Sequence, residues 1–482
     1  MYKKTIAQTF TQKQESCTEN MQQEFLTIRT MIRKKEASEM GANEHSGESR
    51  DVFKNRFGMI LSMAGLAIGL GNCWRFPYLC AKWGGGAFVF AYLVGVVGLV
   101  APLAIVEVAM GKGTQKGLVD TYALTFKNKP AGYVLGSVSA FGQWAQNFYY
   151  VAIMSAIVYF AVGCGTSIWN RVAPDQIYDS LRGNKPLSIG LYVVLLGILL
   201  YTGVKGISKG IEKISNIMVP ALFILFIITF VVTVATTPGI VDGLNYYLNP
   251  DFSQLANPGL WVAAVGQALF SIGVGPGALL VYGSHIKEHG EITVSVLTIC
   301  AMDTCAGLLA GLCIIPACIA FGIDPQSGSS LIFKVLPVVF QKMPAGTIVG
   351  LLLFVGMFFA AFTSACSNQE TAVTSYSDAF HMSRAKVVAI MGVINLAFGI
   401  PCLFSNGWES AWQLITSDFF FMPATVLGGI AYAWVFGVKK IRENQIDPDS
   451  DIKLGSWFDT WVKFIAVPIM VLLAAYTFIQ AF

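Results

Sequence analysis

Three acidic residues, Asp303, Glu107 and Glu370, lie inside long and mainly apolar stretches of the sequence. A carboxylate at membrane depth is costly, so it usually faces a cavity or the protein interior and takes part in binding or transport. Of the three, Asp303 is the best candidate for a functional group. Glu107 and Glu370 could also serve only to brace neighbouring helices.

Two short glycine-rich segments interrupt apolar stretches. Residues 65–72 read GLAIGLGN, and residues 271–277 read SIGVGPG. Glycine costs a helix about 1 kcal/mol per position and proline about 3 kcal/mol, which favours local unwinding. Unwound backbone in a membrane is tolerated where it lines a cavity or lies within protein. Close packing of helices through small residues is the alternative explanation.

The elements that must position these residues are long apolar stretches, which predict an all-α integral membrane protein. About 20 apolar residues cross a bilayer core, and such stretches recur about eleven times. The glycine-rich segments fall in the first and sixth stretches, at corresponding places in two halves of five spans. Paired interruptions of this kind indicate the binding site of a transporter. The predicted spans are 57–80, 86–110, 134–163, 187–203, 212–236, 259–283, 291–321, 346–378, 386–404, 411–436 and 457–481.

The composition favours the same class of protein. Of the 482 residues, 55% are hydrophobic and 12% are charged, whereas soluble domains have about 25% charged residues. The ten cysteines lie mostly in or beside apolar runs without the paired spacing of zinc ligands, so no structural metal site is expected. Residues 1–50 are polar and predict a disordered tail, although Met31 or Met40 could be the true start. Residues 51–482 form the predicted transporter domain.

Basic residues predict the orientation in the membrane. Lys112 follows the second span, Lys205 and Lys209 follow the fourth, and Lys439 follows the tenth, whereas the loop at 237–257 has no lysine or arginine. By the positive-inside rule, the N-terminus is cytoplasmic. An odd number of spans then places the C-terminus outside the cytoplasm. We therefore expect a multi-pass protein of the cell inner (plasma) membrane.

Several motifs give the sequence a specific resemblance to the neurotransmitter:sodium symporters, from about Arg50 to the C-terminus. This resemblance implies a LeuT-like fold, a 5+5 inverted repeat with discontinuous helices 1 and 6. It also implies sodium-driven import of an amino acid or a related small zwitterion by alternating access. The motifs are residues 65–77 (GLAIGLGNCWRFP), 84–88 (GGGAF), 102–111 (PLAIVEVAMG), 261–277 and 363–370.

The resemblance implies two sodium sites, and sodium, as a hard cation, prefers oxygen ligands. In the first site the substrate carboxylate would be a further ligand, which would couple ion and substrate directly. For Thr363 and Ser364, ordinary hydroxyl bonding to the backbone is the alternative. The first site would use Ala67, Asn72, Ser271 and Asp303, and the second Gly65, Ile68, Ala360, Thr363 and Ser364.

The substrate carboxylate would meet the backbone N–H groups of Leu70 and Gly71, because a broken helix offers free donors and a favourable dipole. Tyr150 matches the family tyrosine that also binds this carboxylate, although it could instead be a core aromatic residue. The implied substrate-binding residues are Ala67, Leu70, Gly71, Gln146, Tyr150, Phe270, Ser271, Gly273, Pro276, Ser364 and Asn368.

Three of these residues depart from the apolar members of the family. Pro276 stands where a bulky residue is frequent, and Gln146 and Asn368 are polar. A buried amide without a partner costs about 1–3 kcal/mol. We therefore expect a substrate with a polar side chain rather than a plain aliphatic one.

Chloride dependence is the second property in which we expect this protein to differ from many members of the family. Many relatives have asparagine at the position of Asp303 and use chloride, held partly by a serine one turn later, to offset the sodium charge. This chain has Asp303 and then Gly307. A fixed carboxylate beside sodium would offset the charge, so no chloride requirement is expected.

The resemblance also implies two gates. Arg50 and Asp378 match the cytoplasmic ion pair, and His285 replaces the tyrosine usual beside it, where it would add pH sensitivity or only cap a helix. On the outer side Arg75 matches the family arginine, but its usual acidic partner aligns with Gln413. Asp418 could substitute through a longer distance.

The sequence is also compatible with other functions. A substrate-sensing receptor that lost transport, and a proton-coupled amino acid carrier, are the main alternatives. An enzyme is not expected, because none of the four histidines lies beside a plausible nucleophile. A channel would need an open polar path through a crowd of aromatic residues. The expected partners are the substrate and the lipid bilayer, without nucleic acid, and the oligomeric state is open.

Overall fold

The computed structural model describes residues 50–126, 128–168, 171–326 and 331–480. These residues form helices and connecting loops without a β-strand, which confirms the predicted all-α class. The chain divides into two units, Met1–Arg50 and Asp51–Phe482. The predicted N-terminal tail, except Arg50, lies outside the described residues and stays a prediction.

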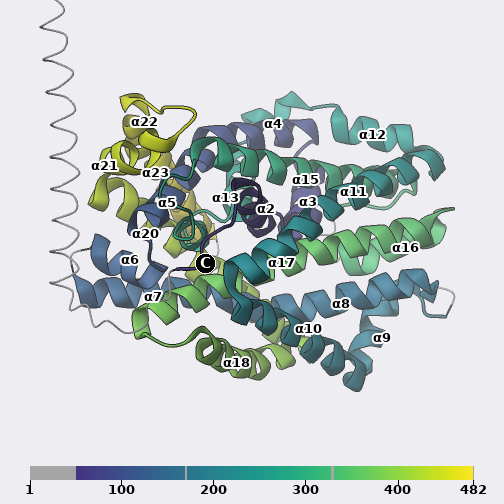
Figure 1. Ribbon diagram of the computed structural model, residues 1–482. Coiled ribbons are helices and arrows are strands. Elements are labelled where there is room, and N and C mark those ends of the chain that lie inside the picture. The colour runs from purple at the N-terminus through teal and green to yellow at the C-terminus, as the bar shows by residue number, and fades with distance from the viewer. Residues whose placement is uncertain (1–49, 127, 169–170, 327–330, 481–482) are drawn as a thin grey trace, which may run out of the picture. The chain divides into compact units, whose positions relative to one another are not determined.

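The second unit is a bundle of helices, several of which continue directly into one another (Figure 1). Its main helices in the first half are α2 (Arg56–Ala67), η1 (Gly71–Arg75), α3 (Phe76–Lys82), α4 (Gly86–Gly95), η2 (Val96–Val100), α5 (Ala101–Thr114), α6 (Leu118–Thr125), α7 (Lys129–Ala145), α8 (Asn147–Gly165), α9 (Ile177–Gly183), α10 (Lys185–Gly206), η5 (Ile207–Ile211) and α11 (Glu212–Thr236). Those in the second half are α12 (Ile240–Leu248), α13 (Pro258–Ile272), α14 (Ala278–Gly283), α15 (Thr293–Ala320), η7 (Leu331–Val335), α16 (Leu336–Lys342), α17 (Gly346–Phe380), α18 (Arg384–Phe404), α19 (Asn406–Leu414), η8 (Ile415–Phe421), α20 (Met422–Ile430), η9 (Ala431–Gly437), α21 (Val438–Ile441), η10 (Arg442–Ile446), α22 (Ser456–Trp461), η12 (Val462–Ala466) and α23 (Val467–Gln480).

Among the described residues, eight helices are long and apolar enough to cross a membrane, or nine when the bent pair α2 and η1–α3 is one span. The run 185–236 counts once, although two spans were predicted there. A positive φ of 77° at Gly206 separates α10 from α11 within this run. Helix α13, in the sixth predicted span, has only 15 residues. The number of eleven spans therefore stays a prediction.

Both predicted interruptions are present. Helix α2 ends at Ala67, the backbone of Ile68 is extended with ψ at 97°, and the helices on the two sides of this break are bent by 56°. In the sixth span α13 ends at Ile272 and α14 begins at Ala278. Between them Gly273, Gly275 and Gly277 have φ values of 74°, 107° and 97°. Glycine adopts such angles readily because it has no Cβ.

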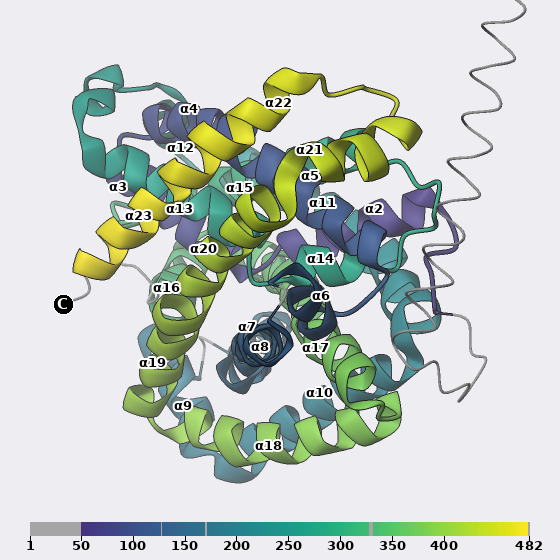
Figure 2. The ribbon, with the colours of Figure 1, turned by 90° about the vertical axis from the view of Figure 1, so that its left-hand side faces the viewer.

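Helix α17 lies against one helix from each of the two interrupted spans. It packs against α8, α11 and α2, and α14 also lies against it. Figure 2 shows α7 and α8 almost end-on, with α17 beside them. The first interruption is also in contact with α15, the helix that contains Asp303. The breaks thus face helices that can supply polar side chains.

We predict that Gly275→Ala lowers the thermal unfolding temperature of the purified protein in detergent. A Cβ at this position would lie 2.2 Å from Thr425 Cα, and the φ of 107° is strained for any residue with a side chain. Gly266→Ala is the matched control, because its Cβ would meet no atom within 4 Å and alanine favours a helix. Equal unfolding temperatures for the two variants would contradict the close approach of these segments.

Candidate functional site

A cavity of about 350 Å³ lies where the two interruptions meet α7, α8 and α17. Ten of the eleven predicted substrate-binding residues line it, and Pro276 does not. The lining residues are Leu66, Ala67, Gly69, Leu70, Gly71, Asn72, Trp74, Arg75, Gln143, Gln146, Tyr149, Tyr150, Phe270, Ser271, Gly273, Ser364, Asn368, Gln413, Ser417, Asp418, Phe421 and Met422.

Pro276 does not line the cavity, and the two residues before it in the second interruption are held by other contacts. The Gly275 N–H donates to Glu107 Oε2 at 2.6 Å, and the Thr425 hydroxyl donates to the Val274 carbonyl at 3.1 Å. Val274 and Gly275, together with Glu107, border a separate small cavity. Glu107 therefore braces the unwound backbone, which is the structural role considered from the sequence.

Asp303 is completely buried and receives three hydrogen bonds. The Asn72 amide and the Ser271 hydroxyl each donate to Oδ1 at 2.8 Å, and the Tyr92 hydroxyl donates to Oδ2 at 2.8 Å. Asn72 belongs to the first interruption and Ser271 to the end of α13. The structure thus joins three of the four residues predicted for the first sodium site, and the fourth, Ala67, lines the adjoining cavity.

Side chains satisfy the backbone of the first interruption. The Gly69 N–H donates to Asn72 Oδ1 at 2.9 Å, and the Leu70 N–H donates to the Tyr150 hydroxyl oxygen at 3.1 Å. Leu70, predicted to offer its N–H directly to the substrate, therefore offers it to Tyr150. Tyr150 lines the cavity, and its hydroxyl also interacts with Ser364.

The residues predicted for the second sodium site lie where α2 and the first interruption contact α17. The Ser364 hydroxyl is 3.2 Å from both the Gly65 and Ile68 carbonyl oxygens, and 3.3 Å from that of Leu66. The hydroxyl of Thr363 bonds instead within its own helix, to the Phe359 and Ala360 carbonyls. Five backbone carbonyls and two hydroxyls thus gather here.

These two groups of atoms suit a hard monovalent cation. The atoms that could bind the cation are carbonyl, hydroxyl, amide and carboxylate oxygens, which hard cations prefer as ligands. Among the described residues no group of three or more histidine, cysteine, aspartate or glutamate side chains could hold a metal ion.

The predicted outer gate is arranged differently from an ion pair. The Arg75 guanidinium lies over the Phe270 ring at 5.2 Å from its centroid. Gln413 donates to Glu409 Oε1 at 3.2 Å, and Glu409 pairs with Arg182 at 2.7 Å. Arg75, Gln413 and Asp418 all line the cavity, but among the described residues Asp418 forms no salt bridge with Arg75.

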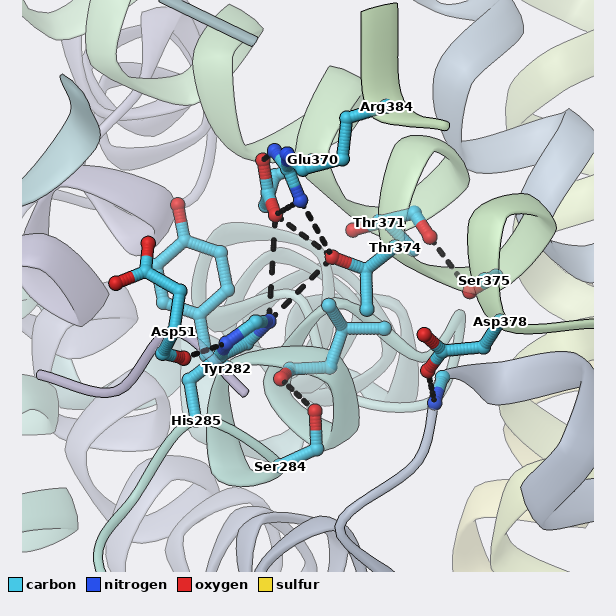
Figure 3. A network of polar contacts seen from close by, with 12 residues as sticks. Asp51, Tyr282, Ser284, His285, Glu370, Thr371, Thr374, Ser375, Asp378 and Arg384 are labelled. Carbon is cyan, nitrogen blue, oxygen red and sulfur yellow. Dashed lines mark hydrogen bonds and ion pairs between the residues drawn. The ribbon is translucent and has the colours of Figure 1, made fainter. Parts of the chain in front are cut away.

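At the opposite end, predicted to be cytoplasmic, a network of buried polar groups surrounds Glu370 (Figure 3). Arg384 donates to both carboxylate oxygens of Glu370, at 2.9 and 2.6 Å, and Thr374 donates to Oε1 at 2.7 Å. His285 Nδ1 lies 2.6 Å from the Asp51 carbonyl, so this nitrogen must carry a proton. His285 thereby connects the start of the unit to α17.

The two residues of the predicted inner gate belong to different units of the chain. Asp378 accepts a hydrogen bond from the Gly117 N–H at 2.7 Å. Arg50 belongs to the other unit of the chain, so its pairing with Asp378 stays a prediction.

Two features of the site were not predicted. A buried carboxylate requires hydrogen-bond donors. Tyr92 was missed because the sequence does not reveal which of the 17 tyrosines supplies one. Gln143 was missed although it stands three residues before Gln146, a spacing that places both side chains on one helix face.

Comparison with known proteins now defines the class. A model of the Sodium:neurotransmitter symporter family matches residues 50–179 and 173–482. An uncharacterized sodium-dependent transporter of Bacillus subtilis is 31% identical over 76% of this chain and 81% of its own length. One of Methanocaldococcus jannaschii is 30% identical over 90% of both chains. The crystal structure of MhsT in complex with L-phenylalanine aligns with a TM-score of 0.76 and 27% identity, over 88% of this chain and 100% of that one.

The chain belongs to the sodium:neurotransmitter symporter family. It is a multi-pass membrane protein with a LeuT-like fold and a sodium-dependent transporter of a small molecule, not an enzyme. Two interrupted helices around one cavity are the geometry that this transport requires.

We predict that Arg384→Met strongly destabilises the protein, because it leaves the fully buried Glu370 carboxylate without its cation. Breaking a buried ion pair on one side costs about 3–5 kcal/mol. The double variant Glu370→Gln/Arg384→Met should recover much of the loss in thermal unfolding temperature. Lys386→Met, at an exposed position of the same helix, is the control. A double variant no more stable than Arg384→Met alone would refute this explanation.

Proposed function

We propose that the protein is a symporter that imports an amino acid together with sodium by alternating access, without a requirement for chloride. The proposal rests on Asp303, a carboxylate buried between the two interrupted helices and bonded to residues of both. A cation at this position would be neutralised by a fixed charge and would lie next to the cavity. A zwitterionic substrate would supply a second carboxylate to the same cation.

Several contacts support an amino acid as the substrate. Tyr150 lines the cavity, and its hydroxyl lies at the broken end of the first span, where it accepts from the Leu70 N–H. The N-terminus of a helix favours an anion, and η1 begins at Gly71. Unwound backbone from both interruptions offers carbonyl oxygens to an ammonium group. The similar protein MhsT was crystallised in complex with an amino acid, L-phenylalanine.

Chloride independence is supported by the donors around Asp303. An anion beside sodium would need hydrogen-bond donors, and the hydroxyls of Ser271 and Tyr92 already donate to the carboxylate. One turn later stands Gly307, which has no hydroxyl. The fixed carboxylate therefore takes the place that an exchangeable anion would occupy.

The second sodium ion is proposed between α2 and α17, where the carbonyls of Gly65 and Ile68 lie beside Ser364. It would hold the first span against α17 and leave when the cytoplasmic side opens. In the proposed orientation the N-terminus is cytoplasmic and the C-terminus lies outside, in the cell inner (plasma) membrane.

Uptake of labelled amino acids into proteoliposomes under an inward sodium gradient tests the function. We expect accumulation of one class of amino acid that requires sodium and persists when gluconate replaces chloride. Accumulation driven only by a proton gradient would refute sodium symport. Binding without accumulation under any ion gradient would indicate a receptor.

We predict that Asp303→Asn reduces the apparent affinity for sodium by more than tenfold. A unit charge about 4 Å from a cation contributes roughly 4 kcal/mol at an effective dielectric constant of about 20, and the asparagine amide lacks that charge. Tyr92→Phe is the matched control, because it removes one hydrogen bond to the same carboxylate and keeps the charge. The sodium dependence of uptake measures both. A smaller effect for Asp303→Asn than for Tyr92→Phe would contradict the assigned role.

A further inference from the structure

One wall of the cavity is formed by a chain of four side-chain amides. Gln146 Nε2 donates to Gln143 Oε1 at 3.3 Å, and Gln143 Nε2 donates to Asn368 Oδ1 at 2.7 Å. Asn368 Nδ2 then donates to Asn147 Oδ1 at 3.3 Å, and Asn147 Nδ2 donates to the Ala365 carbonyl at 3.0 Å. Three of the amides line the cavity, and Asn147 lies behind them.

The last acceptor sets the direction of the whole chain. A backbone carbonyl can only accept a hydrogen bond, so Asn147 must turn its NH₂ group toward Ala365. Its carbonyl oxygen then faces Asn368, which must donate a hydrogen bond from its own NH₂ group. The same reasoning passes through Gln143 to Gln146, so rotating one amide would place two like groups against each other.

This order of hydrogen bonds determines which atom of Gln146, the last amide of the series, has no partner within it. Gln146 uses its NH₂ group toward Gln143, and within the described residues its Oε1 atom has no hydrogen-bond partner. Gln146 lines the cavity but is only 8% exposed, so a ligand can reach Oε1 while bulk water reaches the side chain poorly. The cavity therefore presents a hydrogen-bond acceptor whose orientation is built in.

We propose that Gln146 Oε1 selects substrates whose side chain carries a neutral hydrogen-bond donor, such as a hydroxyl, an amide or an indole N–H. This inference rests on the proposed amino acid function and specifies its substrate class. A donor completes the amide chain, whereas an apolar side chain buries the acceptor without a partner. The amides carry no charge that could compensate a cationic side chain.

The expected discrimination can be measured with nearly isosteric pairs of amino acids. L-Threonine and L-valine differ by a hydroxyl in place of a methyl group, and L-tyrosine and L-phenylalanine differ by a hydroxyl. L-Glutamine and L-methionine differ by a terminal amide. Losing one hydrogen bond to a buried group changes affinity by about 5- to 150-fold, so the donor-bearing member of at least one pair should bind about tenfold more tightly.

The experiment titrates the purified full-length protein in detergent with each amino acid, in sodium and in choline buffer, and follows thermal unfolding. Gln146→Met keeps the length of the side chain and removes the acceptor, so the members of each pair should bind within about twofold of each other. Gln369→Met is the matched control on α17. This buried amide donates to the Leu199 carbonyl and does not line the cavity, so the preference should persist.

The possible outcomes separate this inference from the proposed function. If amino acids bind in sodium but no pair favours the donor, or if Gln146→Met keeps the preference, the inference is overturned and the proposed function stands. If no amino acid binds in sodium, both are overturned. Gln146→Leu makes the same deletion should Gln146→Met fail to fold, and without a folded variant the wild-type ratios decide.

Discussion

Backbone groups left unpaired by two broken helices are the constraint on which the rest of this structure depends. In the apolar interior of a membrane protein each such group needs a partner, and side chains from other spans provide it. Ser364 reaches the carbonyls of the first interruption, Tyr150 accepts from Leu70, and Glu107 accepts from Gly275. Helices α17, α8 and α5 therefore have to lie next to the breaks, and the cavity forms where α17 and α8 meet them.

The same contacts explain how ions and substrate can influence the conformation. Ser364 donates to carbonyls that are proposed ligands of the second sodium ion, so an ion and this hydroxyl would compete for the same oxygens. Asp303 bonds to Asn72 and Ser271, one from each interruption. A cation there would replace donors that now point at the carboxylate. A ligand that interacts differently with two arrangements of the same atoms shifts the balance between them.

The sequence allowed the general architecture and much of the site to be predicted, because helix length, glycine clusters and buried carboxylates are local signals. The interruptions at residues 68–70 and 273–277 were predicted correctly. Other features depend on contacts between distant residues. Pro276 was predicted to line the cavity and does not, and its neighbours Gly275 and Val274 bond to Glu107 and Thr425. The partner of Arg75 could not be assigned from the sequence, since Gln413 stands at the usual acidic position, and the guanidinium lies over the Phe270 ring.

Substrate selectivity illustrates this difference most clearly. The residue types at Gln146 and Asn368 indicate polarity, but an amide can either donate or accept. The backbone carbonyl of Ala365 decides whether the donor or the acceptor group of the amide faces the cavity. This carbonyl lies at the far end of a series of hydrogen bonds that runs from α7 to α17, on to α8 and back to α17. A residue outside the cavity lining therefore orients the residue that we propose contacts the substrate. Polar cavity walls in this fold specify a ligand through the order of their hydrogen bonds as much as through the side chains that line them.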